Sequence, residues 1–538
     1  RDELLRVMGV DSEPVNHGWL CDRGRFNFES VKSDARVLQP MVRTDGALRP
    51  ATWSTAIAEA ARIIRETTAA GAGRVAVIGG SRSTNEDAFA WARLAHEVVG
   101  TPHVDAQLAD GLPNGMLGLP RATIADAAAA ATIVLLGPDL KEELPVLYLR
   151  LRDAAASKRS RIIEFSPRPT GLSPYAWRRV GYEPGAQVQA VRDTFADAAV
   201  SAQLAKGPVV VVVGRANLAE STANTVHALQ QILEIVPGAT VLPAYRRGNV
   251  VGALRMGLRP GESGQHTEGI LRDAAAGSIG CLVLLGADPF ADVPDTQLVT
   301  KAFAGVQHVI AVDTTLTSSS STAHVVLPAA AYAEKAGTTT NIDGRVTAVA
   351  RQVTPAGQAR PDWMIAAELA FQLGVDLGYA DVHDITDDIA ARVDGFAAAT
   401  AAAVAASPDG VLTAVPTTMQ PLAPQAADVA DRLTYDFRLV VSRTLYDRAV
   451  GTALSPSLAG LSTPAAIHVH PLDLDRIGVA PGGSVRVTNG RGSVTMTVQA
   501  TDSVQRGAAW VPFNHEGGPI AELLDCTAPV NDVRIETL

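Results

Sequence analysis

Cys21 is the residue whose type and surroundings best suit redox chemistry. It lies in the run Trp19–Phe26 (WLCDRGRF), where two arginines and a turn glycine follow the thiol. Adjacent cations lower the pKa of a thiol and favour the thiolate that a metal requires. Cys21 is therefore a candidate ligand of an iron–sulfur cluster, which commonly takes four cysteines. The alternative is that Cys21 is a small buried apolar residue, as lone cysteines usually are.

The other cysteines and a pair of histidines suit packing better than chemistry. Cys281 begins an apolar run and Cys526 follows Asp525, so both thiols are expected to be inert. His468 and His470 would face one side of a strand, where they could bind a metal or pack within a domain. Three cysteines in 538 residues cannot form a disulfide framework, which indicates a reducing compartment.

The sequence lacks the standard signatures of an independent catalytic or nucleotide site. It has no GxxxxGK[ST] phosphate loop, no HExxH motif and no paired CxxC motif. The glycine-rich run Gly71–Arg74 precedes a predicted strand, whereas a dinucleotide-binding loop would follow one. The chain is therefore expected to be a scaffold or part of a larger assembly.

The composition is that of a globular, acidic protein. Hydrophobic residues make up 47% and charged residues 19% of the chain, which excludes a wholly disordered or fibrous protein. A net charge of −10 without long basic runs makes nucleic-acid binding a poor prediction. The uncharged stretch 410–427 is interrupted by prolines, so no transmembrane helix is expected. The chain opens with Arg1-Asp2-Glu3 and shows no signal peptide, and we expect further residues upstream of Arg1.

The middle of the chain alternates short β-branched runs with helical patterns, which is typical of parallel sheets covered by helices. Continuous apolar runs predict strands over Val75–Gly80, Thr132–Gly137, Arg161–Phe165, Val209–Gly214, Cys281–Gly286 and His308–Asp313. Helices are expected from a cap at Ser54 to about Ala70, from Thr84 or Asn85 to Val98, and over 362–373.

Two of the predicted strands end in the same way. The runs Ile133–Asp139 and Leu282–Pro289 both lead from an apolar strand into Gly-x-Asp. Ligands of open α/β sheets lie beyond the carboxyl ends of the strands, so the echo suggests two related sheets or two halves that face one cleft. The alternative is a pair of ordinary strand-to-loop turns.

The chain changes character after about Arg432, where strands become short and glycine-punctuated. A hairpin turn at Asn489-Gly490 leads into a run in which Val494, Met496 and Val498 share one face, as in a small β-barrel. The predicted organisation is a cluster-facing segment over 1–48, a first α/β lobe over 49–205, a second lobe over 206–394 that returns to the first, an Ala/Pro-rich linker over 395–431 and a barrel over 432–538.

The run around Cys21 resembles the last cluster-binding cysteine of the molybdopterin oxidoreductase superfamily. Within it, Val15–Phe26 is most similar to the family of the large iron–sulfur (G) subunits of bacterial NADH:quinone oxidoreductase, respiratory complex I. Further matches are Ala323–Pro328, Glu334–Thr338, Asn341–Arg345, the Gly286–Pro289 cofactor loop and the dinucleotide-binding barrel over Arg438–Phe513. The resemblance covers essentially the whole chain. It implies a multidomain molybdopterin-oxidoreductase-like α/β fold with doubly wound parallel sheets and a C-terminal β-barrel.

Departures from the superfamily pattern imply that a molybdenum cofactor has been lost, so no molybdenum is expected. Where molybdenum enzymes place a Cys, Ser or selenocysteine, this chain has Ala106–Asp110, in which no soft ligand stands, although Asp105 or Asp110 could serve. The cofactor loop Pro-Gly-Thr-Asp appears as Pro184–Gln187 (PGAQ). The lysine common in relatives is Arg23, which keeps the charge but donates hydrogen bonds differently.

The resemblance implies an iron–sulfur electron-transfer and scaffold subunit of a proton-translocating NADH:quinone oxidoreductase. Cys21 would be one ligand of a 4Fe–4S cluster whose other cysteines, Cys-x-x-Cys-x-x-x-Cys, lie upstream of Arg1 with additional iron–sulfur clusters. The partners would be the NADH/FMN-binding and 2Fe–2S subunits and the quinone-side iron–sulfur subunits, so NADH and quinone would be reached indirectly. The subunit would lie peripherally at the cytoplasmic side of the inner membrane. No independent catalytic residue is expected.

The resemblance also implies a vestigial cofactor-binding set, which comprises Gly286, Asp288, Pro289, Gly337, Thr338, Asn341, Gly344 and Arg345. Gly344 permits positive φ, and Arg345 could hold a carboxylate or phosphate. Structural use of the same contacts is equally open, since turn capping explains Asp288 and Asp343 without any function. Two alternative functions stay open: a working molybdenum bis-pterin enzyme of the formate dehydrogenase or nitrate reductase type, and an assembly scaffold without a cluster.

Overall fold

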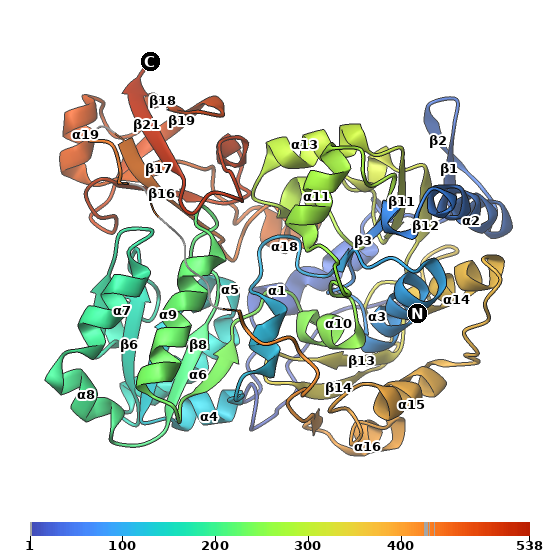
Figure 1. The fold of residues 1–538 in the computed structure, drawn as a ribbon, viewed down its shortest axis with the longest axis horizontal. Helices are drawn as coiled ribbons and strands as arrows, with labels where there is room; N and C mark the ends of the chain where they lie inside the picture. The colour runs from blue at the N-terminus through green and yellow to red at the C-terminus, as the bar shows by residue number, and fades with distance from the viewer. Residues whose placement is uncertain (1–2, 424–428, 430, 435) are drawn as a thin grey trace.

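Two α/β lobes and a β-barrel make up the computed structural model, which describes residues 3–423, 429, 431–434 and 436–538 (Figure 1). The larger sheet has seven strands in the order β2 (Ala47–Pro50), β1 (Met41–Thr44), β12 (Val325–Pro328), β11 (His308–Asp313), β10 (Cys281–Leu285), β3 (Val75–Gly79) and β4 (Val104–Asp105). Its strands are parallel except for β1 and β2, which pair antiparallel at one edge.

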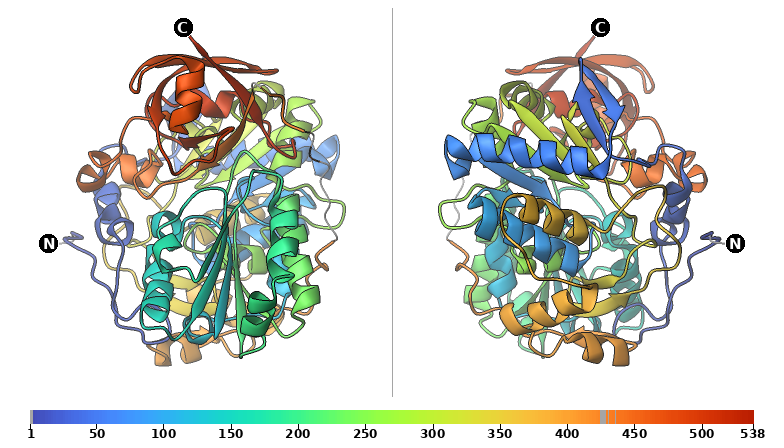
Figure 2. Two further views of the ribbon diagram at one scale, coloured as in Figure 1. Left: turned by 90° about the vertical axis from the view of Figure 1, so that its left-hand side faces the viewer. Right: turned by 90° about the vertical axis from the view of Figure 1, so that its right-hand side faces the viewer.

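A second, five-stranded sheet is entirely parallel. Its order is β7 (Arg178–Gly181), β6 (Arg161–Ser166), β5 (Thr132–Leu136), β8 (Val209–Val213) and β9 (Thr240–Pro243). Helices lie on both sides of it, as predicted for continuous apolar strands (Figure 2). The six strands predicted from apolar runs are all confirmed within a residue of their ends. The chain leaves the seven-stranded sheet after β4, builds the whole five-stranded sheet and then returns at β10. The strands of the larger sheet therefore lie on both sides of residue 205.

The helices begin close to the expected residues, with one correction. The helix α2 (Trp53–Ala69) is capped by Thr52, whose Oγ1 accepts a hydrogen bond from Thr55 N at 3.2 Å, so the predicted cap at Ser54 is wrong by two residues. The helix α3 (Asn85–Arg93) has Thr84 as its cap, and a π-helical turn over Leu94–Val99 continues it to the predicted end. The helix α14 covers Asp362–Gln372, as predicted.

The remaining helices connect and cover the strands. In the two lobes they are α4 (Ile124–Ala129), α5 (Leu140–Glu143), α6 (Pro145–Ala156), α7 (Gln187–Phe195), α8 (Ala198–Leu204), α9 (Thr222–Ile235), α10 (Val250–Met256), α11 (Thr267–Ala275), α12 (Pro289–Asp292), α13 (Thr296–Gly305), α15 (Val382–Arg392) and α16 (Ala401–Ala406). Four short helices of the described chain lie outside the two lobes. One of them, α1 (Asp22–Phe26), precedes the first strand, and the C-terminal domain contains α17 (Val450–Ala453), α18 (Pro456–Ala459) and α19 (Pro471–Ile477). No helix among the described residues is long and apolar enough to cross a lipid bilayer.

A small antiparallel sheet uses part of the stretch predicted as an Ala/Pro-rich linker. It consists of β13 (Gly337–Thr340), β14 (Arg345–Val349) and β15 (Val411–Leu412). Phe396 is buried nearby in the main core, so this part of 395–431 packs against the lobes. Residues 424–428 and 430 of the predicted linker lie outside the described residues.

The C-terminal domain is the predicted β-barrel. It closes in the order β16 (Asp436–Ser442), β20 (Ala508–Pro512), β17 (Ile467–Val469), β19 (Gly492–Ala500), β18 (Ser484–Asn489) and β21 (Asp532–Thr537). Val494, Met496 and Val498 are buried inside it, as their alternation predicted. The barrel has its own hydrophobic core, whereas one continuous core joins the two lobes.

Candidate functional site

Cys21 lies at the start of α1 and is half-buried. Its Sγ accepts a hydrogen bond from Gly24 N at 3.4 Å, an interaction that stabilises a thiolate ligand. Arg23, two residues further on, pairs with Asp447 of the barrel domain at 2.6 Å. Arg23 Nε is buried and bonds no atom of the described chain. A thiol that accepts a backbone hydrogen bond, two residues from a guanidinium with an unpartnered N–H, suits one ligand of an anionic iron–sulfur cluster.

The other cysteines do not join Cys21. Cys281 is buried in β10, and Cys526 is buried near the end of the chain. Burial raises the pKa of Cys281 to about 12, which makes its thiol inert. Within the described part of the chain, no group of three or more His, Cys, Asp or Glu side chains is placed to hold a metal ion. The described residues therefore give Cys21 no further metal ligands around it.

Asp105 and Asp110, the two carboxylates that could replace a molybdenum ligand, are already engaged. Asp105 Oδ2 accepts hydrogen bonds from the backbone N and the hydroxyl of Thr267 at 2.9 and 2.7 Å, which caps α11. Asp110 accepts from Arg247 Nη1 and Nη2 at 2.7 and 3.0 Å and from Arg443 Nη2 at 2.8 Å. Burial opposes ionisation, but these arginines hold the pKa of Asp110 below its usual value. Neither carboxylate is free for a metal.

Asp110 belongs to a set of charges, buried except for the exposed Arg82, that we call the ionic junction. Its members are Arg82, Arg246, Arg247, Arg443, Asp110, Asp292 and Asp447. They follow the carboxyl ends of β3, β4, β9 and β10 in the two lobes and of β16 in the barrel. Such strand ends are where open α/β sheets bind ligands, and here protein side chains fill the position.

Sequence reasoning missed the arginines of the ionic junction. Arg246 and Arg247 stand together after the apolar run that forms β9, and this pair was the one available signal. Nothing local identifies their partners, because Asp110 and Asp447 are more than a hundred residues away in the sequence.

The predicted cofactor loop after β10 is held by internal contacts. Gly286 O accepts a hydrogen bond from Arg82 Nη1 at 3.0 Å. Asp288 accepts from the backbone N and the hydroxyl of Ser319 at 3.2 and 2.5 Å, and burial raises its pKa. Pro289 starts α12. This loop thus borders the ionic junction, through Arg82.

The predicted residues over 337–345 contact different elements. Thr338 N and Oγ1 each donate to Glu86 of α3 at 2.7 Å. Asn341 Oδ1 accepts from Arg345 N at 2.9 Å, and Gly344 has φ +80°, as its turn requires. Gly337 packs where an added Cβ would meet Glu86. The predicted cofactor-binding residues are therefore divided. The loop 286–289 lies beside the ionic junction, whereas Gly337 and Thr338 contact α3.

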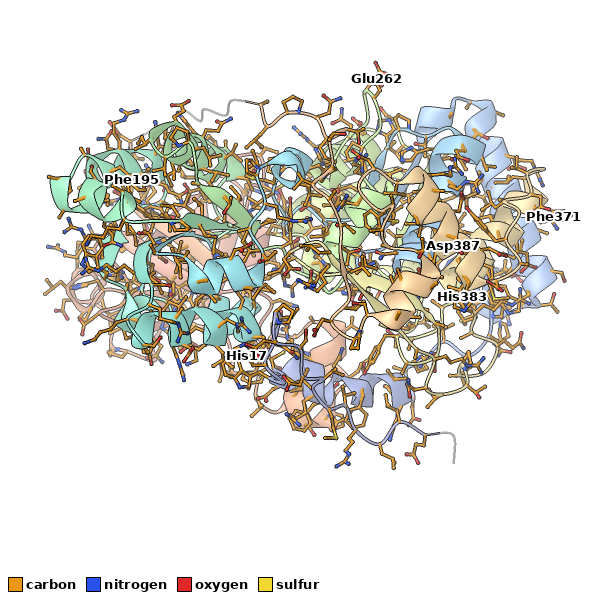
Figure 3. All side chains as sticks on the ribbon, turned by 90° about the horizontal axis from the view of Figure 1, so that it is seen from below. His17, Phe195, Glu262, Phe371, His383 and Asp387 are labelled. Atoms are coloured by element: carbon orange, nitrogen blue, oxygen red, sulfur yellow. The ribbon has the colours of Figure 1, made fainter. Side chains whose placement is uncertain are left out.

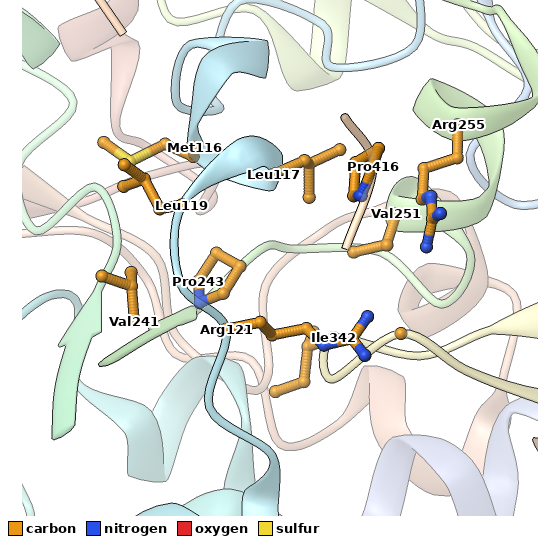
Figure 4. A pocket seen from close by; sticks show the side chains of 11 residues that line it. Met116, Leu117, Leu119, Arg121, Val241, Pro243, Val251, Arg255, Ile342 and Pro416 are labelled. Carbon is orange, nitrogen blue, oxygen red and sulfur yellow. The ribbon is translucent and has the colours of Figure 1, made fainter. Parts of the chain in front are cut away.

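A narrow cavity borders the 341–345 turn (Figure 4). Its volume is about 10 Å³, and its lining includes Arg121, Arg255, Ile342, Gly344, Met116 and Val251. That volume is about what one water molecule needs, so an organic cofactor does not fit there. Arg255 Nη1 instead donates to Thr413 Oγ1 at 2.6 Å, and Arg121 to the Thr413 carbonyl.

The two barrel histidines do not form a metal site. The His468 ring lies against Trp510 with a centroid distance of 4.6 Å. His470 Nδ1 accepts from Leu472 N at 3.2 Å and caps α19. Packing and capping account for both, which favours the packing alternative.

Comparison with known proteins gives two family matches. The molybdopterin oxidoreductase family matches residues 36–372, and the molydopterin dinucleotide binding domain matches residues 437–534. The chain is 28% identical to the NADPH-Fe(3+) oxidoreductase subunit alpha of Geobacter sulfurreducens, over 100% of this chain and 72% of that protein. It is 30% identical to the G subunit of the NADH-quinone oxidoreductase of Mycobacterium tuberculosis, over 98% and 67%.

A solved structure shares the fold. Acetylene hydratase from Pelobacter acetylenicus superimposes with a TM-score of 0.70 at 11% identity, over 98% of this chain and 96% of that one. Identity this low supports the fold alone. Together with the sheets and the closed barrel, it confirms the predicted fold class.

Proposed function

Because the chain belongs to the molybdopterin oxidoreductase family, we propose that it is an iron–sulfur electron-transfer and scaffold subunit of a proton-translocating NADH:quinone oxidoreductase. Its similarity to the G subunits of that enzyme along almost the whole chain supports this role. Its partners would be the NADH/FMN-binding, 2Fe–2S and quinone-side iron–sulfur subunits. It would lie peripherally at the cytoplasmic side of the membrane, with no independent active site.

The molybdopterin-type domain has, in this proposal, lost its molybdenum cofactor. The observation that carries it is the state of Asp110, whose oxygens are taken by Arg247 and Arg443 within a buried ionic junction. A metal at this position would have to break those ion pairs, which would leave Arg443 without its carboxylate partner and Arg247 with the longer 3.7 Å contact to Asp292. The residues at this position therefore offer no uncommitted ligand for molybdenum, which supports the proposed loss.

The residues around Cys21 do fit one ligand of a 4Fe–4S cluster, whose other ligands would lie upstream of Arg1. Such a cluster supplies one-electron transfer when bound. Cys21 would hold it, the Gly24 N–H would stabilise the thiolate, and Arg23 would place a positive charge beside it. The Arg23–Asp447 ion pair would hold the segment around Cys21 against the barrel domain.

Metal analysis of the full-length subunit tests both parts. We expect Cys21→Ala to lose about one four-iron cluster, seen as lower iron content and a missing EPR signal, while the matched control Cys281→Ala keeps it. Unchanged iron content in Cys21→Ala would refute the cluster assignment. About one molybdenum per chain, in a host that makes the cofactor, would refute its loss and favour a formate dehydrogenase or nitrate reductase type of enzyme.

The Geobacter relative favours a second candidate, in which the same scaffold serves an NADPH-oxidising complex that reduces ferric iron. Both candidates assign Cys21 the same role. Assays of the purified complex with NADH and quinone, and with NADPH and ferric iron, separate them by which pair supports turnover.

A further inference from the structure

Given the proposed role of Cys21 as a cluster ligand, we propose that Asp447 is a positioning residue for the cluster site. It holds the Arg23 guanidinium beside that site and balances its charge, and the pair thereby sets the reduction potential of the cluster.

A segment of the barrel domain covers the helix that follows Cys21. This clamp segment comprises residues 444–459, between β16 and β17, and includes α17 and α18. Tyr446 OH donates to Asp22 Oδ2 at 2.6 Å, and the backbone N and hydroxyl of Ser457 donate to the two oxygens of Glu29 at 2.9 and 2.6 Å. The segment that follows Cys21 is thus held by the C-terminal domain, more than four hundred residues further along the chain.

Asp447 is the charged residue of the clamp segment that reaches furthest in. Its side chain is 0% exposed, and Oδ1 accepts from Arg23 Nη2 at 2.6 Å and from Ala449 N at 3.1 Å. Its Oδ2 lies 3.5 Å from Arg246 Nη2 of the ionic junction. The carboxylate is therefore fixed between two cations, with the backbone holding it in place.

Arg23 transmits this arrangement to Cys21. It stands two residues from the thiol, and its guanidinium also donates to the Thr444 carbonyl at 3.4 Å. The charged groups that act on the Arg23 guanidinium are Asp447, Arg246, Cys21 and Glu143. Since Asp447 is fully buried and the Arg23 side chain is 28% exposed, these charges act on one another more strongly than charges on the open surface do.

The sign of the effect follows from the electron count. One-electron reduction takes a 4Fe–4S core from the 2+ to the 1+ state and so adds one negative charge. A nearby cation favours the reduced state and raises the potential, whereas a nearby anion lowers it. Arg23→Gln should therefore lower the midpoint potential, and Asp447→Asn should raise it. The double variant removes one charge of each sign and should return close to the wild-type value.

The test measures the midpoint potential of the Cys21 cluster in the intact complex, by EPR-monitored titration with dithionite as the reductant. Arg159→Gln, which removes one member of an exposed ion pair with Asp153, is the control and should cause no shift. Asp447→Glu keeps the charge and should keep the potential. Opposite shifts in the two single variants that cancel in the double variant support the inference.

Shifts of the same sign, or no shift in Arg23→Gln, would overturn the positioning role even if Asp447→Asn fails to assemble, because Arg23→Gln leaves Asp447 paired with Arg246. The proposed function fails separately, if the titrated EPR signal persists in Cys21→Ala.

Discussion

Lys335 lies between two buried carboxylates and donates to both, at 2.6 Å to Asp87 Oδ2 and at 2.6 Å to Asp362 Oδ2. Lys335→Met should destabilise the folded chain by about 3–5 kcal/mol, because it leaves two buried negative charges without their cation. Chemical denaturation measures the loss, and Lys206→Met, at an exposed position, should change stability by less than about 0.5 kcal/mol. Equal stabilities for the two variants would contradict this assignment.

Asp313 gives the chain a specific pH dependence. Burial raises its pKa to about 7, although the backbone N of Thr314 donates to it at 2.8 Å. The folded chain therefore binds this proton more tightly than the unfolded chain does. The resulting contribution to the free energy of unfolding is present at acid pH and is lost as the pH rises through 7. Asp313→Asn should become more stable relative to wild type between pH 4 and pH 8, by up to roughly 4 kcal/mol. Urea titrations across this range check it. Asp45→Asn, at an exposed residue, should show no such trend.

At the scale of elements, β13 depends on a glycine. Gly337 has φ +155°, and a Cβ there would meet Glu86 and Thr84 of the α3 cap. Gly337→Ala should break the Thr338–Glu86 hydrogen bonds and cost about 2–4 kcal/mol, because the buried carboxylate would lose two donors and keep the Thr386 hydroxyl. Thermal unfolding compares it with Gly238→Ala, where the added methyl meets no atom within 4 Å. A melting temperature no lower than that of the control would count against this role of Gly337.

The elements that sequence could predict are those encoded locally. The all-valine strand Val209–Val213 is predicted as buried from its own residue types. The alternation of apolar and polar residues in β19 likewise predicts which face is buried. The cap of α2 was misplaced because Thr52 and Ser54 both carry hydroxyls, and the side-chain geometry decides between them. The strand β15 was missed because its pairing with β14 is a tertiary contact inside an Ala/Pro-rich stretch.

At the scale of the whole molecule, the lobes and the barrel are joined in different ways. One apolar core runs through both lobes. The barrel has a second core, which takes in Leu218 and Ala219 of the loop after β8, and it also meets the lobes through charges. The sequence indicated the fold and singled out Cys21 and Asp110. The sequence could not indicate that two arginines bind the Asp110 carboxylate, because Arg247 and Arg443 come from two other parts of the chain. Figure 3 shows how densely side chains fill the space between the elements.

Asp110 should therefore matter for joining the domains. Asp110→Asn removes the charge of the carboxylate that Arg247 and Arg443 share and leaves Asp292 as the nearest carboxylate to Arg247, which should cost about 3–5 kcal/mol. The loss should be localised, since the core of each lobe is untouched. Hydrogen exchange followed by mass spectrometry should show faster exchange over residues 106–112, 244–249 and 443–449, while the strands β5 and β8 keep their protection. Asp153→Asn removes a carboxylate from an exposed ion pair and should leave exchange unchanged in all these segments. If Asp110→Asn exchanged like this control, the ionic junction would not contribute measurably to joining the barrel to the lobes.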